Sequence, residues 1–330
     1  MSTSRAAVLL DHMDNALGSL DNALGSSVAA LGSSVATAKP EKVGLEEYYV
    51  EAGPDYAAWS REFNMHFGYY RWGMNPLDRE PMLEQMNVEV LERLWIDRAT
   101  ESRIIDLGCG LGATLRSLAR RLPLASLTGV TRVPWQVEQA RGRNTATPNG
   151  DRIPNGDRIQ VAQLDYEKTR LPSGSFDAAY AIESACYAHG ADKAAFLKEA
   201  KRLLRPGGRL VMVDGFLRSS SHMRPMQRRI FDKLCECWVI ESWGELDRVE
   251  AQLRLLGFRD IRVEECQFRV APSAFHIPWV TLEFLIRDVL LGKRKMTRAR
   301  WNNVLAPVLL PLVSWPLGPL VYGIVSATRE

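Results

Sequence analysis

An acidic residue and three glycines, spaced to suit ligand binding, occur together in one short stretch of the chain. Asp106 ends an apolar run, and Gly108, Gly110 and Gly112 follow it. Because glycine has no side chain, such a loop can turn sharply and let the backbone approach a ligand closely. No Lys-Ser/Thr pair follows to bind phosphates. The Asp106 carboxylate therefore favours a cationic or hydroxyl-rich ligand over a pyrophosphate, which it would repel.

The elements that must position these residues alternate between strand and helix from residue 101 onward. This alternation predicts an α/β fold with a doubly wound, mostly parallel sheet, in which ligands bind at the carboxyl ends of the strands. The predicted strands cover residues 104–107, 124–130, 159–164, 176–182, 209–214 and 261–266, and a later, antiparallel one covers 320–327. The predicted helices in this part cover residues 114–122, 134–143, 193–204 and 249–256.

Bulk composition narrows the class of protein. The chain has 330 residues, of which 46% are hydrophobic and 25% charged, as in soluble globular proteins. A net charge of +3 is too small to favour nucleic acid as a partner. Five cysteines without metal-ligand spacing predict no metal site and favour a reducing compartment such as the cytoplasm.

Composition also divides the chain into predicted parts. Residues 1–44 repeat the sequence Asp-Asn-Ala-Leu-Gly-Ser with a period of seven, which favours a flexible or loosely helical tail over a coiled coil. Such a tail could reach a neighbouring subunit, so a homo-oligomer stays open. Residues 45–98 are rich in aromatic side chains and are predicted to form a helical lid. Residues 99–267 and 320–330 form the predicted core, residues 268–319 an apolar cap insertion, and a duplication at residues 148–159 a surface loop.

Four motifs resemble those of class I S-adenosylmethionine-dependent methyltransferases in order and spacing. They are Asp106-Leu-Gly-Cys-Gly-Leu-Gly112, Asp165-Tyr166, Leu171-Pro-Ser-Gly-Ser-Phe-Asp177 and Leu203-Leu-Arg-Pro-Gly-Gly-Arg-Leu210. The resemblance covers residues 101–266 and 320–329 and implies S-adenosylmethionine as the cofactor. It implies that Asp106 and the glycine loop, Gly108 to Gly112, hold the methionine part. Asp165, followed by Tyr166, would contact the adenine amino group.

One departure from the common pattern points to a branch of that family. Most of these enzymes carry Asp or Glu at the end of the second strand, whereas this chain has Thr131 there, followed by Gln136. This arrangement resembles the branch that contains sterol, tocopherol and prenyl-diphosphate C-methyltransferases. It implies that Thr131 and Gln136 contact the ribose and the methionine part. The alternative is that Thr131 only caps the next helix, and both can hold at once.

The end of the fourth predicted strand carries the candidate catalytic residues. Methyl transfer needs the acceptor, methyl group and sulfur in line, with water excluded. A double-bond acceptor also needs a group that stabilises the resulting carbocation. A hydroxyl or amine acceptor needs a base instead. The segment Ala181-Ile-Glu-Ser-Ala-Cys-Tyr-Ala-His189 resembles that of the C-methylating branch. Glu183 is predicted to stabilise the cation or take its proton; the alternative is that it only bonds to the cofactor or a loop. His189 is the second candidate base and ranks below Glu183.

The acceptor is expected to be a hydrophobic small molecule. Carbon methylation of an isoprenoid or terpenoid double bond is the leading hypothesis, and O- or N-methylation of an aromatic, polyketide or other secondary metabolite is the alternative. Aromatic residues in the lid and near the cap are the predicted substrate contacts, namely Tyr49, Phe67, Tyr69 and Trp238.

Two further segments could contact the acceptor or a membrane. The basic run Arg224-Pro-Met-Gln-Arg-Arg229 could hold a diphosphate through paired hydrogen bonds, or it could be a solvated helix face. Basic residues at 292–300 precede an apolar stretch at 304–320. Pro307, Pro311, Pro316 and Pro319 are expected to break a helix there, so peripheral contact with a membrane or a hydrophobic substrate fits better than a transmembrane span.

Overall fold

The sheet that organises the molecule is seen in a computed structural model, which describes residues 43–145, 156–218, 223–292, 295–314 and 318–330. The predicted tail up to residue 42 and the duplicated loop up to residue 155 lie outside the described residues. Within them, the strands follow the order β3-β2-β1-β4-β5-β8-β7, with β6 paired to β5. The strands are β1 Ser102–Leu107, β2 Ala125–Thr131, β3 Ile159–Gln163, β4 Phe176–Ile182, β5 Leu204–Leu217, β6 Gly244–Glu245, β7 Phe258–Glu265 and β8 Leu320–Arg329.

The strand directions confirm the predicted doubly wound α/β fold. Strand β8 runs antiparallel to both β5 and β7, and the remaining described pairs are parallel. Ile104 and Ile105 in β1 are both buried and join different core clusters, because successive side chains of a strand point to opposite faces. Asp106 pairs in register with Gly129 of β2 and Tyr180 of β4, so the carboxyl ends of three strands meet beside the glycine loop.

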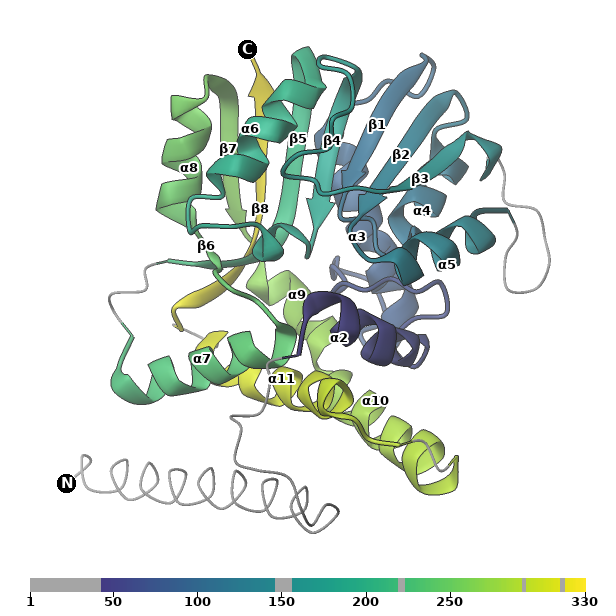
Figure 1. The fold of residues 1–330 in the computed structure, drawn as a ribbon, viewed down its shortest axis with the longest axis vertical. Helices are drawn as coiled ribbons and strands as arrows, with labels where there is room; N and C mark the ends of the chain where they lie inside the picture. Colours follow the sequence, from purple (N-terminus) through teal and green to yellow (C-terminus); the bar gives the residue numbers. More distant parts are fainter. Residues whose placement is uncertain (1–42, 146–155, 219–222, 293–294, 315–317) are drawn as a thin grey trace. The chain divides into compact units, whose positions relative to one another are not determined.

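Helices cover both faces of the sheet (Figure 1). Helices α3, α4 and α5 pack on one face through a cluster that includes Val90, Leu118 and Val137. Helices α6 and α8 pack on the other through Phe196 and Leu253. The helix at 79–94, expected in the lid, therefore belongs to the sheet layer. The helices are α2 Leu45–Ala52, α3 Arg79–Leu94, α4 Ala113–Arg121, α5 Pro134–Thr145, α6 Ala194–Leu203, α7 Pro225–Trp238, α8 Leu246–Leu255, α9 Gln267–Ala274, α10 Ile277–Phe284 and α11 Arg298–Ser314.

Short helical turns complete the described secondary structure, and two strands differ from the prediction. Strand β5 begins at Leu204, directly after α6, so the Pro206-Gly207-Gly208 run lies within the strand. The strand carries a register shift against β4. The two-residue strand β6 has no signal in the sequence. The turns are 3₁₀ helices η1 Gly53–Ala57, η2 Gly156–Arg158 and η3 Ala185–Tyr187, and η5 Leu285–Leu291 is a π-helical continuation of α10.

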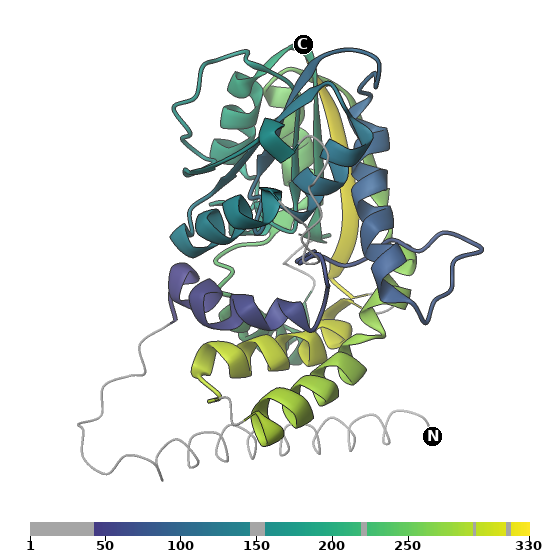
Figure 2. The ribbon, with the colours of Figure 1, turned by 90° about the vertical axis from the view of Figure 1, so that its right-hand side faces the viewer.

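A layer of helices lies beyond the carboxyl ends of the parallel strands, formed by α2, α7, α9, α10 and α11 (Figures 1 and 2). The expectation that prolines break the helix is wrong for Pro307 and Pro311, because α11 continues through both to Ser314. Its buried side chains, Ala306, Leu309 and Val313, pack in the cluster that also holds α7, and this packing offsets the lost backbone hydrogen bonds. No helix in the described residues is both long and apolar enough to cross a bilayer.

Candidate active site

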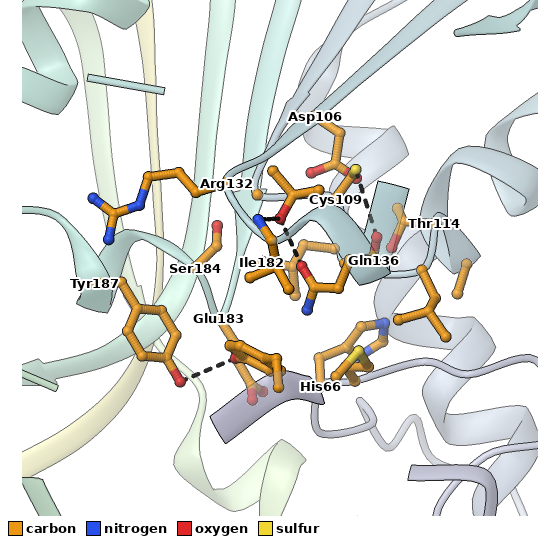
Figure 3. A pocket seen from close by; sticks show the side chains of 18 of the residues that line it. His66, Asp106, Cys109, Thr114, Arg132, Gln136, Ile182, Glu183, Ser184 and Tyr187 are labelled. Carbon is orange, nitrogen blue, oxygen red and sulfur yellow. Dashed lines mark hydrogen bonds between the residues drawn. The ribbon is translucent and has the colours of Figure 1, made fainter. Parts of the chain in front are cut away.

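The glycine loop after β1 forms one side of a pocket (Figure 3). The backbone nitrogens of Gly108 and Cys109 each donate to Val130 O at 3.0 Å, which folds the loop back over the end of β2. Gly108 adopts φ +110°, and a Cβ at this position would lie 2.3 Å from the Cβ of Ser184. Gly110 adopts φ +50°. A side chain at Gly108 would therefore collide with the loop after β4, and one at Gly110 would be strained.

The end of β2 forms the second side of the pocket. Thr131 Oγ1 donates to Gln136 Oε1 at 2.6 Å and accepts from Val133 N at 3.2 Å, and both Thr131 and Gln136 are buried. Helix α5 begins only at Pro134, so Thr131 is the last residue of β2 and not the helix N-cap. The two residues predicted to act together are thus in direct contact at the pocket lining.

The end of β4 brings Glu183 to the third side of the pocket. Glu183 adopts φ +47°, an uncommon conformation for a residue with a side chain. Its Oε1 accepts hydrogen bonds from the backbone nitrogen of Phe67 at 2.7 Å and from the Tyr322 hydroxyl at 2.5 Å. Its Oε2 accepts none from the residues that the structure describes. Burial is the main cause that raises the pKa of Glu183 to about 8, and the two donors partly offset it.

Residues from the N-terminal part close the pocket. Leu45 and Tyr49 of α2, and Phe63, Met65 and His66, complete the lining of a hollow that holds about 780 Å³ up to its open mouth. We call residues 63–66 the covering segment. Tyr49 donates to the Tyr187 hydroxyl at 3.0 Å, which connects α2 to the loop after β4.

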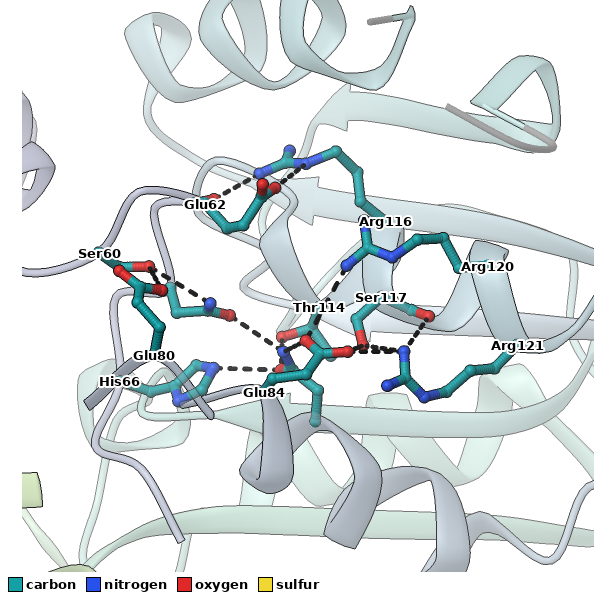
Figure 4. Close-up of polar contacts among 12 residues, drawn as sticks. Ser60, Glu62, His66, Glu80, Glu84, Thr114, Arg116, Ser117, Arg120 and Arg121 are labelled. Atoms are coloured by element: carbon teal, nitrogen blue, oxygen red, sulfur yellow. Dashed lines mark hydrogen bonds and ion pairs between the residues drawn. The ribbon is translucent and has the colours of Figure 1, made fainter. Parts of the chain in front are cut away.

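A buried polar network fixes the covering segment against α4 (Figure 4). Arg116 is buried on α4 and donates from Nη1 to Leu111 O and from Nη2 to Glu62 O, both at 2.6 Å. His66 Nε2 lies 3.1 Å from Asn87 Oδ1, and burial lowers the pKa of His66. Arg116 thus ties the glycine loop to the backbone next to the covering segment.

Asp106 lies buried in the lining without a cationic partner among the described residues. Burial raises the pKa of Asp106 to about 8, and the nearby Tyr180 hydroxyl partly offsets this effect. A buried carboxylate of this kind is stabilised by a ligand that carries a positive charge. A ligand with an ammonium group, such as the methionine part of S-adenosylmethionine, fits this position.

Eight of the predicted site residues line the pocket, and Ser184, Tyr187, Met65, His66 and Arg132 join them without having been predicted individually. The predicted ones in the lining are Tyr49, Asp106, Gly108, Gly110, Thr131, Gln136, Tyr166 and Glu183. Gly112 adopts φ +75° at the start of α4, at the end of the loop but outside the lining.

The other predicted residues lie outside the lining. The Asp165 side chain is 41% exposed and lies 3.6 Å from the guanidinium of Arg132, itself a lining residue. His189 is exposed and pairs with Glu167, which raises the pKa of its ring. His189 therefore does not line the pocket; its ring faces the carboxylates of Glu167, which is mostly buried, and of the exposed Glu241.

Three predicted substrate aromatics also lie behind or away from the lining. Phe67 reaches the site through its backbone nitrogen, while its ring packs on Trp59 and Tyr322. Tyr69 lines a separate surface hollow among arginine and glutamate side chains. Trp238 packs against the clusters that join α7 to α2.

Comparisons with known proteins identify the family. A family model described as a methyltransferase domain matches residues 105–212. The chain is 36% identical over 210 residues to an O-methyltransferase from Pyrenophora dematioidea, covering 61% of this chain and 69% of that protein. The chain belongs to the class I S-adenosylmethionine-dependent methyltransferases. This methyltransferase is also 25% identical over 304 residues to the chloroplastic tocopherol O-methyltransferase of Arabidopsis thaliana, covering 87% of this chain and 82% of that one.

A solved structure shares the fold of this methyltransferase. The cyclopropane synthase MmaA2 from Mycobacterium tuberculosis matches with a TM-score of 0.70 at 15% identity, covering 88% of this chain and 100% of that one. The resemblance to the methyltransferase family is thereby confirmed, and S-adenosylmethionine is the cofactor of this methyltransferase.

Among the described residues, no group of three or more His, Cys, Asp or Glu side chains is placed to hold a metal ion.

The site contains one contact that sequence reasoning missed entirely. Tyr322 lies on β8, 139 residues after Glu183, and donates the shortest of the hydrogen bonds described above to its carboxylate. Only the pairing of β8 beside β5 brings it there, and no local motif marks it. Residues 63–70 of the predicted lid supply three lining residues, Phe63, Met65 and His66.

Proposed function

We propose that this methyltransferase methylates a carbon–carbon double bond of a hydrophobic small molecule of the isoprenoid or terpenoid type. The observation that carries the proposal is the Glu183 carboxylate, held at the pocket by Phe67 and Tyr322 with Oε2 left without a described partner. Methylation of a double bond leaves a carbocation on the acceptor, and aromatic faces beside a carboxylate stabilise such a charge. Tyr49, Tyr166 and Tyr187 line the same pocket, as aromatic neighbours for that cation.

The cofactor residues follow from the pocket geometry together with the family resemblance. S-adenosylmethionine, when bound, supplies a methyl group already activated by its positive sulfur. In the proposal, Asp106 pairs with the ammonium group beside Gly108 and Gly110, and Thr131 and Gln136 hold the ribose and methionine part. The adenine amino group meets Asp165 next to Tyr166 at the edge of the lining, while Gly112 allows the tight turn into α4.

Glu183 then has two tasks in sequence. As the methyl group adds to one carbon of the double bond, the carboxylate offsets the positive charge that develops on the other carbon. Its Oε2 next accepts a proton from a neighbouring carbon, and the electrons of that C–H bond form the new double bond. Tyr49 and the covering segment keep water from the cation.

The acceptor is proposed to lack a diphosphate. Arg132 is the one arginine or lysine among the described lining residues, and it lies near Asp165. Arg224 and Arg229 are exposed at the start of α7 and line no described part of the pocket. The basic run is therefore assigned to a solvated helix face.

Methylation of a hydroxyl group is the second candidate, favoured by the raised pKa of Glu183. A carboxylate whose pKa is about 8 can accept a proton from a phenol near neutral pH, so Glu183 would then act as a general base. The relatives from Pyrenophora dematioidea and Arabidopsis thaliana are named O-methyltransferases, which supports this candidate as well. N-methylation has no specific observation in its favour.

The test follows the position of the methyl group in the product. The full chain is incubated with S-adenosylmethionine labelled with ¹³C in the methyl group and with a sterol, a prenylated hydroquinone, a tocopherol or geranyl diphosphate. We expect product from a neutral prenylated acceptor with the label on carbon, and a rate that falls at least about 100-fold in Glu183→Gln. A label on oxygen would replace the proposal by the second candidate, and an unchanged rate in Glu183→Gln would contradict both.

A further inference from the structure

An apolar stripe without a packing partner among the described residues runs along α10 and η5. Phe275 is 75% exposed, Trp279 68% and Leu290 73%, and Leu282 and Ile286 lie between them. Phe275 lies in the turn just before α10, and the spacing of three, four and four residues places the other four on one side of the helix. We call these five residues the α10 stripe.

The opposite side of the same helix packs into the protein. Ile277, Val280 and Phe284 are buried. Both sides of the helix therefore carry apolar side chains, but only one of them is buried. Figures 1 and 2 both place α10 on the outer side of the cap, away from the sheet. A contiguous exposed patch of Trp, Phe, Leu and Ile side chains is uncommon on monomeric proteins and marks an interaction surface.

Charge near the stripe indicates the kind of partner. Arg287 pairs with Glu283 and Asp288, so these carboxylates do not stand as unpaired negative charges. In the sequence, Lys293-Arg294-Lys295 follows the helix directly, and the Lys295 residue is exposed. An apolar helix face with Trp, Phe and Leu beside a basic run is the pattern of helices that lie in the surface of an anionic bilayer.

We propose that the α10 stripe docks onto the surface of an anionic lipid membrane. Trp279 and the aliphatic side chains enter the boundary between headgroups and acyl chains, and Lys295 contacts the lipid headgroups. Because α11 packs against both α10 and α2, the docked cap lies next to the helix that carries Tyr49 into the pocket. Supply of the hydrophobic acceptor from the bilayer is a consequence that rests on the proposed function, whereas docking itself does not.

The test measures flotation of the full chain with vesicles of phosphatidylcholine, alone or mixed with phosphatidylglycerol. We expect binding to the mixed vesicles, a loss of at least about tenfold in partition for the double variant Trp279→Ser/Leu290→Ser, and a smaller loss for Lys295→Glu that is confined to anionic vesicles. Leu255→Ser is the matched control, since Leu255 is 80% exposed but lies on α8 over the sheet. It should bind as the wild type does.

Binding of S-adenosylhomocysteine by each variant reports an intact fold and stays the same under the proposal. Absence of vesicle binding by the wild type would overturn docking, and so would an equal loss in Leu255→Ser. A wild-type dimer that Trp279→Ser/Leu290→Ser dissociates, without vesicle binding, would show that a second copy of the chain covers the stripe. These readouts do not depend on methyl transfer, so failure of docking and failure of the proposed function are distinguishable.

Discussion

Glu183 combines three unusual features in a single residue. It has a left-handed backbone conformation, a carboxylate in a mostly buried position, and a hydrogen bond from a strand far along the chain. Its own backbone nitrogen donates to Val213 O at 2.7 Å, which helps to hold the strained conformation. Strain of this kind costs roughly 1–3 kcal/mol and concentrates at functional sites. The residue is therefore the centre of the proposed chemistry.

Replacing Tyr322 by phenylalanine should shift the pH dependence of turnover upward. The hydroxyl donates to the carboxylate and so stabilises its charged form; without it the pKa of Glu183 rises above about 8. Because both candidate reactions need the ionised carboxylate, the rising limb of kcat/KM should move up by about one pH unit. Tyr70→Phe, at a tyrosine outside the lining, should leave the profile in place. An unchanged pH profile of kcat/KM in Tyr322→Phe would mean that ionisation of Glu183 does not control the pH-dependent step.

Replacing His189 by alanine should leave turnover nearly unchanged. The ring is exposed and pairs with Glu167 outside the pocket lining, and surface pairs of this kind contribute little. We expect kcat/KM within about twofold of the wild type. A loss of more than tenfold would return the role of base to His189.

A buried lysine, Lys193, holds the turn η3 that follows Glu183. Lys193 Nζ donates to Ala188 O at 2.6 Å and Cys186 O at 3.2 Å, and also to Ser242 O. Asp214 Oδ2 accepts from the backbone nitrogen of Cys186 at 2.9 Å. The two charged residues thus satisfy both the carbonyls and an amide of the turn, which fixes the loop that lines the pocket.

Lys193→Met should destabilise the protein by about 2–4 kcal/mol, because it leaves buried carbonyl groups without donors. Lys198→Met is the matched control, since Lys198 is exposed on α6 and its replacement should change the free energy of unfolding by less than about 0.5 kcal/mol. Urea unfolding of the two variants measures both values. Equal stabilities would show that the turn does not depend on Lys193.

How far the sequence predicts the site depends on how local each contact is. Short apolar runs and turn residues predict the strand ends and the glycine loop, so the sequence alone places Asp106, Thr131 and Glu183 at one edge of the sheet. Tyr322 could not, because its contact with Glu183 depends on the pairing of β8. The orientation of His189 toward Glu167 and of Tyr69 into another hollow also comes from tertiary packing. Packing of α11 against α7 likewise overrides the prolines that predict a broken helix.

At the scale of the whole molecule, buried carboxyl groups tie stability to pH. The pKa is raised to about 8 in Asp106 and Glu183 and to about 6 in Asp214, chiefly by burial. Between the ordinary carboxyl pKa near 4 and these values, the folded state holds protons that the unfolded state has released. The contribution of these groups to stability is therefore fully present below about pH 4 and is lost as pH rises toward 8.

Asp106→Asn should remove part of this pH dependence in the cofactor-free protein. Asparagine has no proton to lose, so the variant gains stability relative to the wild type as pH rises from 6 to 8, by on the order of 1–2 kcal/mol. Urea unfolding at the two pH values measures the change. A constant difference between variant and wild type would mean that Asp106 is already ionised at pH 6.

Binding of the cofactor at the glycine loop can be measured by calorimetric titration of S-adenosylhomocysteine, which keeps the ammonium group of the cofactor, into the full chain. We expect one site whose affinity rises with pH up to about 8, as Asp106 ionises, and an affinity at least about tenfold weaker and independent of pH in Asp106→Asn. Equal affinity in the two proteins, or no binding by the wild type, would contradict the placement of the cofactor at the glycine loop.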